Sequence, residues 1–178
     1  EPYRRQRQMC IRDRNIIEVK SMKCKDVMTK NIITCFKNTT IREVAKIMRD
    51  KYIGMIPVVY EDTGFVAGLI TDRDIVTRVI AYDKSVDDKV CNFMTVEFVS
   101  VYENDDISIG ITKMADYQIK RIIVLNNYKQ ITGIISLKDI ALNKDTNMYL
   151  NDLVNEICIP NPQVNKPQSY LRCDDFPL

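Results

Sequence analysis

The fold is decided by a stretch that occurs twice, at Gly68–Ile75 and at Gly133–Ile140. The first reads Gly-Leu-Ile-Thr-Asp-Arg-Asp-Ile, and 65 residues later the second reads Gly-Ile-Ile-Ser-Leu-Lys-Asp-Ile. In each copy a glycine and two aliphatic residues precede a hydroxyl residue, and an aspartate follows that hydroxyl residue by three positions. This order is typical of a strand that ends where a helix begins. The repeat predicts two copies of one structural unit.

The similarity extends toward the N-terminus of both copies. The tripeptide Val27–Thr29 returns as Phe93–Thr95, and the apolar run Ile32–Phe36 returns as Phe98–Tyr102, both at an offset of 66. The unit therefore spans roughly 50–55 residues, a length typical of a supersecondary repeat. A chain of 178 residues has room for two such units with a shared core.

Each copy is predicted to form β-α-β-β-α. In the first copy the apolar run Ile32–Phe36 predicts a strand, and Thr39 or Thr40 can cap a following helix. The apolar residues of that helix recur at the spacing of one helical face. They are Ile41, Val44, Ala45 and Met48.

The remainder of the first copy predicts a hairpin and a second helix. Met55–Tyr60 and Phe65–Thr71 are apolar strands, and Glu61–Gly64 supplies the turn between them. Asp72–Tyr82 predicts a helix. Its expected inward-facing residues are Ile75, Val76, Val79 and Ile80.

The connections predict the topology of the sheet. The first strand reaches the hairpin through a helix, so it should run parallel to one hairpin strand. In the second copy, Asn126 and Asn127 should form the hairpin turn because asparagine tolerates positive φ. The expected fold class is α/β (α+β), with two helices on one side of each small sheet and the two repeats packed with pseudo-twofold symmetry.

The chain divides into five predicted segments. They are a disordered or foreign leader at 1–22, repeat 1 at 23–83, repeat 2 at 84–145, a C-terminal helix at 146–160 and an irregular tail at 161–178. Positions 1–14 hold five arginines and two acidic residues, a net charge of 5 − 2 = +3. Because the net charge of the whole chain is +2, the remaining residues carry 2 − 3 = −1. An arginine-rich arm can bind nucleic acid or an anionic membrane. We instead interpret the arginine-rich arm as a leader, and we expect the chain to bind neither nucleic acid nor a membrane. Because the sequence shows no secretory signal pattern, we expect the chain to be cytoplasmic.

Composition argues against an enzyme. The chain has no histidine, which removes the most frequent general base and metal ligand. Its six cysteines form no C-x-x-C pair, and no glycine-rich phosphate loop of the common types occurs. Cys35 lies in an apolar run and is expected to be a small core residue. We therefore expect no catalytic residue, no metal site and no required cofactor.

The repeat resembles the cystathionine-β-synthase-type (CBS) domain, and the tandem resembles a CBS pair, or Bateman module. The motifs that carry the resemblance are Asp26–Thr29, Ile56–Val59, Gly68–Ile75, Phe93–Thr95, Lys120–Val124 and Gly133–Ile140. The resemblance implies a sensor that binds an adenosyl ligand (AMP, ADP, ATP or S-adenosylmethionine) in the cleft between repeats. It also implies disc-like homodimers.

The resemblance further implies the site residues. Thr71 and Asp74 would serve one pocket and Ser136 and Asp139 the other, with each carboxylate accepting hydrogen bonds from ribose hydroxyls. The remaining candidates are Thr34 and Ser100 near the adenine, the backbone around Ile56 and Ile122 along the base, and Arg73, Arg121 and Lys138 at phosphates. Sequence differences between the copies predict unequal pockets.

Two alternatives stay open for these residues. The pattern hydroxyl-x-x-Asp is also a helix capping box, and the three basic residues can be solvated surface charges. The predicted function is regulation through an adenosyl ligand. The alternative is a ligand-free scaffold that dimerises and binds an unidentified protein partner.

Overall fold

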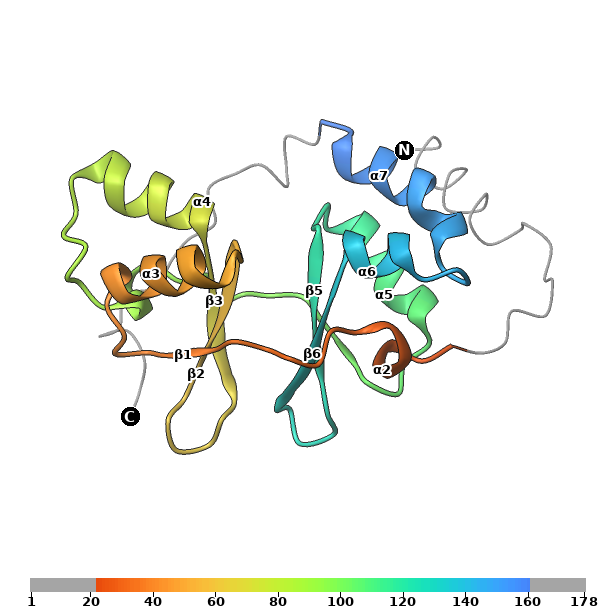
Figure 1. Cartoon of the computed structure of the whole chain (residues 1–178), viewed down its shortest axis with the longest axis horizontal. Coiled ribbons are helices and arrows are strands. Elements are labelled where there is room, and N and C mark those ends of the chain that lie inside the picture. Colours follow the sequence, from red (N-terminus) through yellow and green to blue (C-terminus); the bar gives the residue numbers. More distant parts are fainter. Residues whose placement is uncertain (1–21, 161–178) are drawn as a thin grey trace.

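The computed structural model describes residues 22–160 and contains two three-stranded sheets (Figure 1). The strands are β1 (Cys35–Phe36), β2 (Met55–Val59) and β3 (Val66–Thr71) in the first sheet, and β4 (Ser100–Tyr102), β5 (Arg121–Leu125) and β6 (Ile131–Ser136) in the second. In each sheet the first strand pairs parallel to the second, and the second pairs antiparallel to the third. The predicted topology is confirmed, although β1 is shorter than the predicted strand. The leader, except for Met22, and the tail at 161–178 lie outside the described residues.

The helices cover one side of each sheet. They are α2 (Cys24–Val27), α3 (Ile41–Lys51), α4 (Asp72–Asp74), η1 (Ile75–Val79), η2 (Ile80–Tyr82), η3 (Val90–Asn92), α5 (Ile107–Asp116), α6 (Leu137–Leu142), η4 (Asn147–Tyr149) and α7 (Leu150–Cys158). Figure 1 shows α3 and α4 together beside the first sheet, and α5 and α6 together beside the second. This arrangement confirms the mixed α/β class. No helix within residues 22–160 is both long and apolar enough to cross a membrane.

The helix α3 begins at a complete capping box. The backbone N–H of Glu43 donates to Thr40 Oγ1 at 3.2 Å, and the backbone N–H of Thr40 donates to Glu43 Oε2 at 2.9 Å. These two bonds satisfy donors that the first helical turn leaves unpaired. Three of the predicted inward residues are buried, namely Ile41, Val44 and Met48. The prediction for Ala45 is wrong: it is exposed, because the buried face is centred on Ile41, Val44 and Met48, with Ile47 half-buried beside them, and Ala45 lies on the other edge of that face.

The second helix of the first copy also differs from its prediction. The predicted single helix at 72–82 consists of α4, the π-helical turn η1 and the 3-10 turn η2. Only Val79 of its four expected inward residues is buried; Val76 is 58% exposed and Ile80 is 55% exposed. A π-helical turn changes the number of residues per turn, so side chains beyond it leave the face predicted from α-helical spacing.

The two copies exchange their leading segments. Cys24 and Val27 of α2 are buried in the core of the second copy, whereas Phe93 and Met94 are buried in the core of the first. Short antiparallel bridges tie these segments to the opposite sheet, pairing Thr29 with Ile134 and Leu69 with Thr95. Figure 1 shows α2 beside the second sheet. Each core is therefore completed by residues that precede the other copy.

Two glycines of the repeated stretch make this exchange sterically feasible. A Cβ atom at Gly68 would lie 2.7 Å from the carbonyl oxygen of Thr95, and a Cβ atom at Gly133 would collide with the Met28 side chain. Any larger residue would push the crossing segment away from the strand. The glycines thus mark where the exchanged segments cross β3 and β6.

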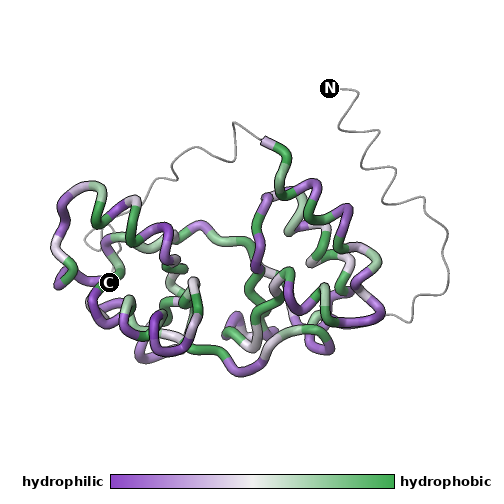
Figure 2. Tube along the Cα trace, turned by 45° about the horizontal axis from the view of Figure 1, so that its top comes forward, coloured by the Kyte–Doolittle hydropathy of each residue, from purple (hydrophilic) through white to green (hydrophobic). Residues whose placement is uncertain are grey.

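A third apolar cluster joins the two sheets. Its buried members are Met55, Ile123 and Leu125, and half-buried residues such as Leu69 and Phe98 pack against them. Figure 2 shows hydrophobic and hydrophilic residues interspersed along the chain of both copies. The two copies therefore pack through their sheets, as expected from units that cannot cover their own apolar faces.

The second hairpin turn uses a different residue from the predicted one. Lys129, not an asparagine, adopts positive φ, at 61°. Asn126 instead accepts backbone N–H bonds at its Oδ1 from Tyr128 at 2.9 Å and from Gln130 at 3.0 Å. Such Asx bonding fixes the turn through the side chain.

Candidate ligand-binding clefts

Two clefts lie between the copies, one at each aspartate motif. The first cleft is formed by the Thr71–Asp74 motif and by residues 95–99 and 117–121 of the second copy, and its volume is about 750 Å³. The second cleft is formed by Ser136 and Asp139 with residues 29–33 and 52–55 of the first copy, and its volume is about 200 Å³. Ligand pockets usually measure ~300–1,000 Å³, so only the first cleft lies in that range.

The motif of the first cleft is a capping box. The backbone N–H and the hydroxyl of Thr71 donate to Asp74 Oδ2 at 2.9 and 2.6 Å, and the backbone N–H of Asp74 donates back to Thr71 Oγ1 at 3.1 Å. The structure therefore contains the capping box that was one of the two interpretations of this motif. It positions the carboxylate at the wall of the cleft rather than in open solvent.

Arg78 adds a second partner for this carboxylate. Its guanidinium lies 3.1 Å from Asp74 Oδ1, and both side chains are mostly buried, with 12% and 14% of their surfaces exposed. Arg78 also donates to the carbonyl oxygen of Phe93 at 2.7 Å. The ion pair thus links the motif to the exchanged segment of the second copy.

The motif of the second cleft is capped in the same way but held differently. The backbone N–H of Ser136 donates to Asp139 Oδ2 at 2.7 Å, and the Ser136 hydroxyl donates to the same oxygen. The remaining oxygen, Oδ1, accepts a bond from the Thr29 hydroxyl at 2.8 Å. Here an uncharged hydroxyl takes the place that a guanidinium holds in the first cleft.

The charges of the two clefts also differ. Four basic and three acidic side chains line the first cleft, namely Arg73, Arg78, Lys120, Arg121, Asp72, Asp74 and Glu97. In the second cleft the lining charges are Arg121 and Asp139. Arg121 lines both clefts, as do Gly54 and Met55. The first cleft is therefore the larger and the richer in groups that can pair with an anion.

The structure brings some predicted site residues together and leaves others apart. Thr71, Arg73, Asp74 and Arg121 line the first cleft; Ser136, Asp139 and Arg121 line the second. Five others line neither cleft, namely Thr34, Ile56, Ser100, Ile122 and Lys138.

The strand positions explain part of this outcome. Ile56 and Ile122 are 0% and 1% exposed and belong to the cores of their own copies. Since side chains alternate along a strand, the preceding residues, Met55 and Arg121, face the clefts instead. Ser100 lines a separate groove, and its carbonyl oxygen accepts a bond from Lys113 Nζ at 2.8 Å.

Sequence reasoning missed two residues that contact the carboxylates. Arg78 stands four positions after Asp74, the spacing of an ion pair on one helical face. Thr29 belongs to the repeated tripeptide at 27–29, but only the exchange of leading segments brings it to Asp139. No group of three or more potential metal ligands occurs among the described residues.

Two small α/β repeats that exchange their leading segments, with a hydroxyl-x-x-Asp motif at each interface cleft, define a tandem CBS-domain architecture. The CBS domain family model matches residues 24–81 and 90–143. The chain belongs to the CBS domain family.

Relatives of this chain are found among bacterial and archaeal proteins. Protein YlbB of Bacillus subtilis is 38% identical over 135 residues, which cover 76% of this chain and 90% of that protein. The CBS domain pair of protein MJ0100, solved in complex with 5′-methylthioadenosine and S-adenosyl-L-methionine, is 29% identical with a TM-score of 0.60, covering 67% of this chain and 93% of that one. CBS domain protein PAE2072 from Pyrobaculum aerophilum, solved with AMP, is 19% identical with a TM-score of 0.66, covering 74% and 99% of the chains, and shares the fold.

Proposed function

We propose that this chain is a regulatory module that binds an adenosyl ligand, such as AMP, ADP, ATP or S-adenosylmethionine, in the first cleft. The observation that carries the proposal is the first cleft itself, with about 750 Å³ of space beside Asp74 and four basic side chains. Support comes from the CBS pair of MJ0100, which was solved with two adenosyl ligands. The chain would act without catalysis, through the ligand's effect on the packing of its two copies.

The carboxylate of Asp74 retains capacity for a ligand. A carboxylate accepts about four hydrogen bonds. The described contacts to Asp74 are two from Thr71 and one from Arg78, which leaves room for about one ribose hydroxyl. Arg73 and Arg121 line the same cleft and supply positive charge for phosphates.

The second cleft is proposed to bind more weakly or to stay empty. Its volume of about 200 Å³ is small for an adenosyl group, and its single lining cation is Arg121. A ligand in the first cleft that engages Arg121 would also change the second cleft, because the same side chain lines both. Such coupling typically amounts to ~1–3 kcal/mol between sites.

We also propose that the chain forms a homodimer through the helices after the two motifs. Val76 and Ile80 of the first copy are 58% and 55% exposed, and Leu142 of α6 is 73% exposed. Burying such residues against a second copy would remove apolar surface from water. Light scattering should report a dimer that a Val76→Glu substitution weakens. A chain that is still monomeric at about 100 µM would argue against the homodimer.

A ligand-free scaffold remains the second candidate, and one observation favours it. Both motif aspartates already receive three hydrogen bonds or ion-pair contacts within the chain. In that case an unidentified protein partner would bind to the surface of the folded pair of repeats, and neither carboxylate would need a ligand.

Calorimetry distinguishes the two candidates. Titration of the purified chain with AMP, ATP and S-adenosylmethionine should give saturable heat for at least one of them. A thermal-shift series at millimolar ligand provides an independent readout. Neither heat nor a shift with any of the three would overturn the adenosyl proposal and favour the scaffold.

A further inference from the structure

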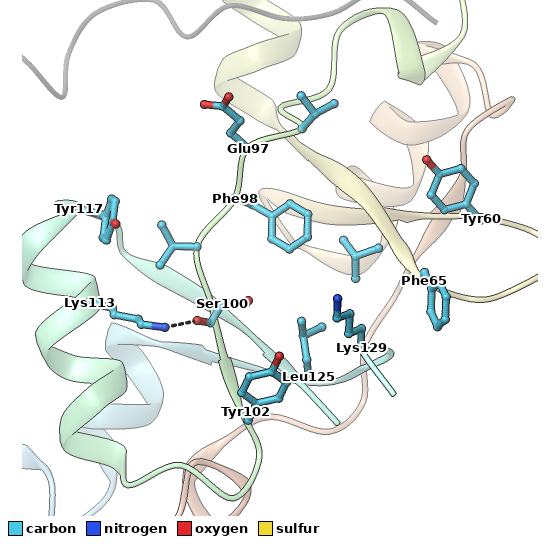
Figure 3. Close-up of a pocket in the computed structure, with 13 residues that line it drawn as sticks. Tyr60, Phe65, Glu97, Phe98, Ser100, Tyr102, Lys113, Tyr117, Leu125 and Lys129 are labelled. Atoms are coloured by element: carbon cyan, nitrogen blue, oxygen red, sulfur yellow. Dashed lines mark hydrogen bonds between the residues drawn. The ribbon is translucent and has the colours of Figure 1, made fainter. Parts of the chain in front are cut away.

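A third hollow lies beside the first cleft and is lined by five aromatic rings. We call it the aromatic groove; its rings are those of Tyr60, Phe65, Phe98, Tyr102 and Tyr117, and its volume is about 930 Å³. Figure 3 shows Tyr60 and Phe65 on one side, Tyr102 and Leu125 on the other, and Phe98 between them. The rings come from the first hairpin, from the segment that contains β4 and from the end of α5.

Three of these rings are exposed. Phe65 is 42% exposed, Tyr102 is 43% exposed and Tyr117 is 53% exposed. Aromatic rings contribute large areas of contact and prefer stacked or edge-to-face partners. The groove therefore offers stacking surface that the folded chain leaves unused.

The duplication provides an internal control for the role of the rings. At the equivalent positions of the other copy, the residues are Asn126, Gln130, Ile32, Phe36 and Lys51. Only Phe36 is aromatic, yet both copies form the same three-stranded sheet and hairpin. The fold of the repeat thus does not require four of the five rings.

The groove is also predominantly basic. Lys113 and Lys129 line it together with a single acidic residue, Glu97, and Lys37 Nζ lies 4.9 Å from the centre of the Tyr60 ring. The bond from Lys113 to the carbonyl oxygen of Ser100 fixes one of these cations at the wall (Figure 3).

The backbone at Lys129 gives a further indication. Lys129 has a φ of 61°, whereas the equivalent residue of the first hairpin is Gly64, with a φ of 69°. A left-handed conformation is costly for lysine and cheap for glycine. The second hairpin therefore keeps a cation at a position where its counterpart has the unstrained residue.

We propose that the aromatic groove binds a planar aromatic anion of nucleotide size, at a site that adjoins the first cleft and shares Glu97, Phe98, Val99 and Tyr117 with it but does not include Asp74. The rings would stack on the planar group, and Lys113 and Lys129 would pair with its phosphate or carboxylate. The exposed faces of the rings would supply the stacking contact. Because Lys113 and Lys129 outnumber Glu97, the groove should favour a negatively charged ligand.

Flavin mononucleotide is a suitable probe because its ring is planar, it carries a phosphate and its fluorescence falls on stacking with tyrosine. Titration of the full chain should show saturable quenching with a midpoint below 1 mM. Riboflavin, which lacks the phosphate, should bind at least fivefold more weakly. Absence of saturable flavin mononucleotide binding up to 1 mM, or equal binding of riboflavin, would overturn the proposal.

The variants replace a groove residue by the residue at the equivalent position of the other copy. We expect the fold to be preserved, because the other copy forms the same hairpin with that residue. Tyr60→Asn, Phe65→Gln and Lys129→Gly each install the residue that the equivalent position already holds. Each should weaken flavin mononucleotide binding at least fivefold. Tyr128→Asn is the matched control, since Tyr128 lies on the second hairpin, is 76% exposed and does not line the groove; it should leave binding unchanged.

A variant of the first cleft separates the two sites. Asp74→Asn should leave flavin mononucleotide binding within twofold, and Phe65→Gln should leave the calorimetric heat of an adenosyl ligand unchanged. If Asp74→Asn abolishes probe binding and the groove variants do not, the probe occupies the first cleft and the groove proposal is wrong. Failure of adenosyl binding alone would leave the groove proposal standing.

Discussion

At the scale of single residues, the two motif aspartates show how one repeated pattern acquires two environments. Each caps its helix through a hydroxyl residue, but Asp74 pairs with Arg78 whereas Asp139 accepts the hydroxyl of Thr29. The partner differs because the equivalent of Arg78 in the second copy is Asn143. This substitution is one of the differences that make the clefts chemically unequal.

The bond between Thr29 and Asp139 should have a measurable effect on stability. Thr29→Val removes this hydroxyl and should lower the free energy of unfolding by ~0.5–1.5 kcal/mol. Thr95→Val is the matched control, because the described structure gives the equivalent Thr95 side chain no hydrogen bond to Asp74. Urea denaturation of both variants checks the difference; equal losses would show that the bond contributes nothing specific.

Buried cysteines should be protected from alkylation. Burial raises the pKa of Cys35 to about 12, and burial together with Asp105 and Asp106 raises the pKa of Cys24 to about 12. At pH 8 iodoacetamide should therefore modify the exposed Cys158 before either, as measured by peptide mass spectrometry. Faster labelling of Cys24 or Cys35 in the native chain would contradict their burial.

The same shifts make stability depend on alkaline pH. In the unfolded chain these thiols ionise near a pKa of 9.0, whereas in the folded chain Cys24 and Cys35 ionise at a pKa of about 12. The unfolded state thus loses protons first, and the free energy of unfolding should fall between about pH 9 and about pH 12. Replacing Cys35 by Ser should reduce this slope in urea denaturation; an unchanged slope would refute the assignment.

At the scale of elements, the segments that cross the sheets depend on glycine. Gly68→Ala would place a Cβ atom against the backbone carbonyl of Thr95, which cannot move independently of the crossing segment. Gly133→Ala would meet the Met28 side chain, including its Cβ atom at 2.9 Å, which no change of rotamer can move. Both substitutions should therefore force the crossing segment to shift and should destabilise the fold, by about 1–3 kcal/mol each.

The comparison needs only thermal or urea unfolding of the two single variants under the same conditions. Gly64→Ala tests a different effect, since Gly64 has positive φ and open space around it. Unchanged stability of Gly68→Ala or of Gly133→Ala would contradict the close crossing at that glycine.

Elements were predictable from sequence to different degrees. The strands and the capping box of α3 followed from alternation, helical spacing and hydroxyl residues, since these signals are local. The segment 72–82 was not predictable in detail, because a π-helical turn leaves the apolar spacing looking like that of a regular helix. The turn at Lys129 was missed because asparagine fixed it through side-chain bonds instead of through its own φ.

At the scale of the whole molecule, the exchange of leading segments couples the two copies. Val27 completes the second core and Met94 completes the first. This pairing could not be predicted from one sequence, because the repeat pattern is the same whether a leading segment packs on its own copy or on the other. The same exchange explains why Thr29 was missed as a partner of Asp139.

Local destabilisation should therefore cross between copies. Val27→Ala creates a cavity in the second core and should increase amide hydrogen exchange in α5 and β6 more than in α3. Met94→Ala should have the opposite distribution, with the larger increase in α3 and β3. An increase confined to the copy that contains the substituted residue in sequence would contradict the exchange.

The candidate site was predictable as a set of motifs but not as a geometry. The structure places Thr71 and Asp74 at the first cleft, whereas the side chains of Ile56 and Ile122 lie in the cores of their own copies because the preceding residue of each strand faces the clefts. Sequence differences between the copies predicted unequal clefts, but which cleft is the larger depends on long-range packing, which spacing in the sequence does not encode.

The most direct test of the central proposal is calorimetric titration of the chain with AMP beside two matched variants. We expect saturable binding of AMP that Asp74→Asn weakens at least tenfold and that Asp139→Asn changes by less than threefold. Asp74→Asn also breaks the buried ion pair with Arg78, whereas Asp139→Asn affects only the bond from Thr29, so thermal unfolding must show that both variants are folded at the titration temperature. Equal effects of both variants, or wild-type binding by Asp74→Asn, would contradict the assignment of the ligand to the first cleft.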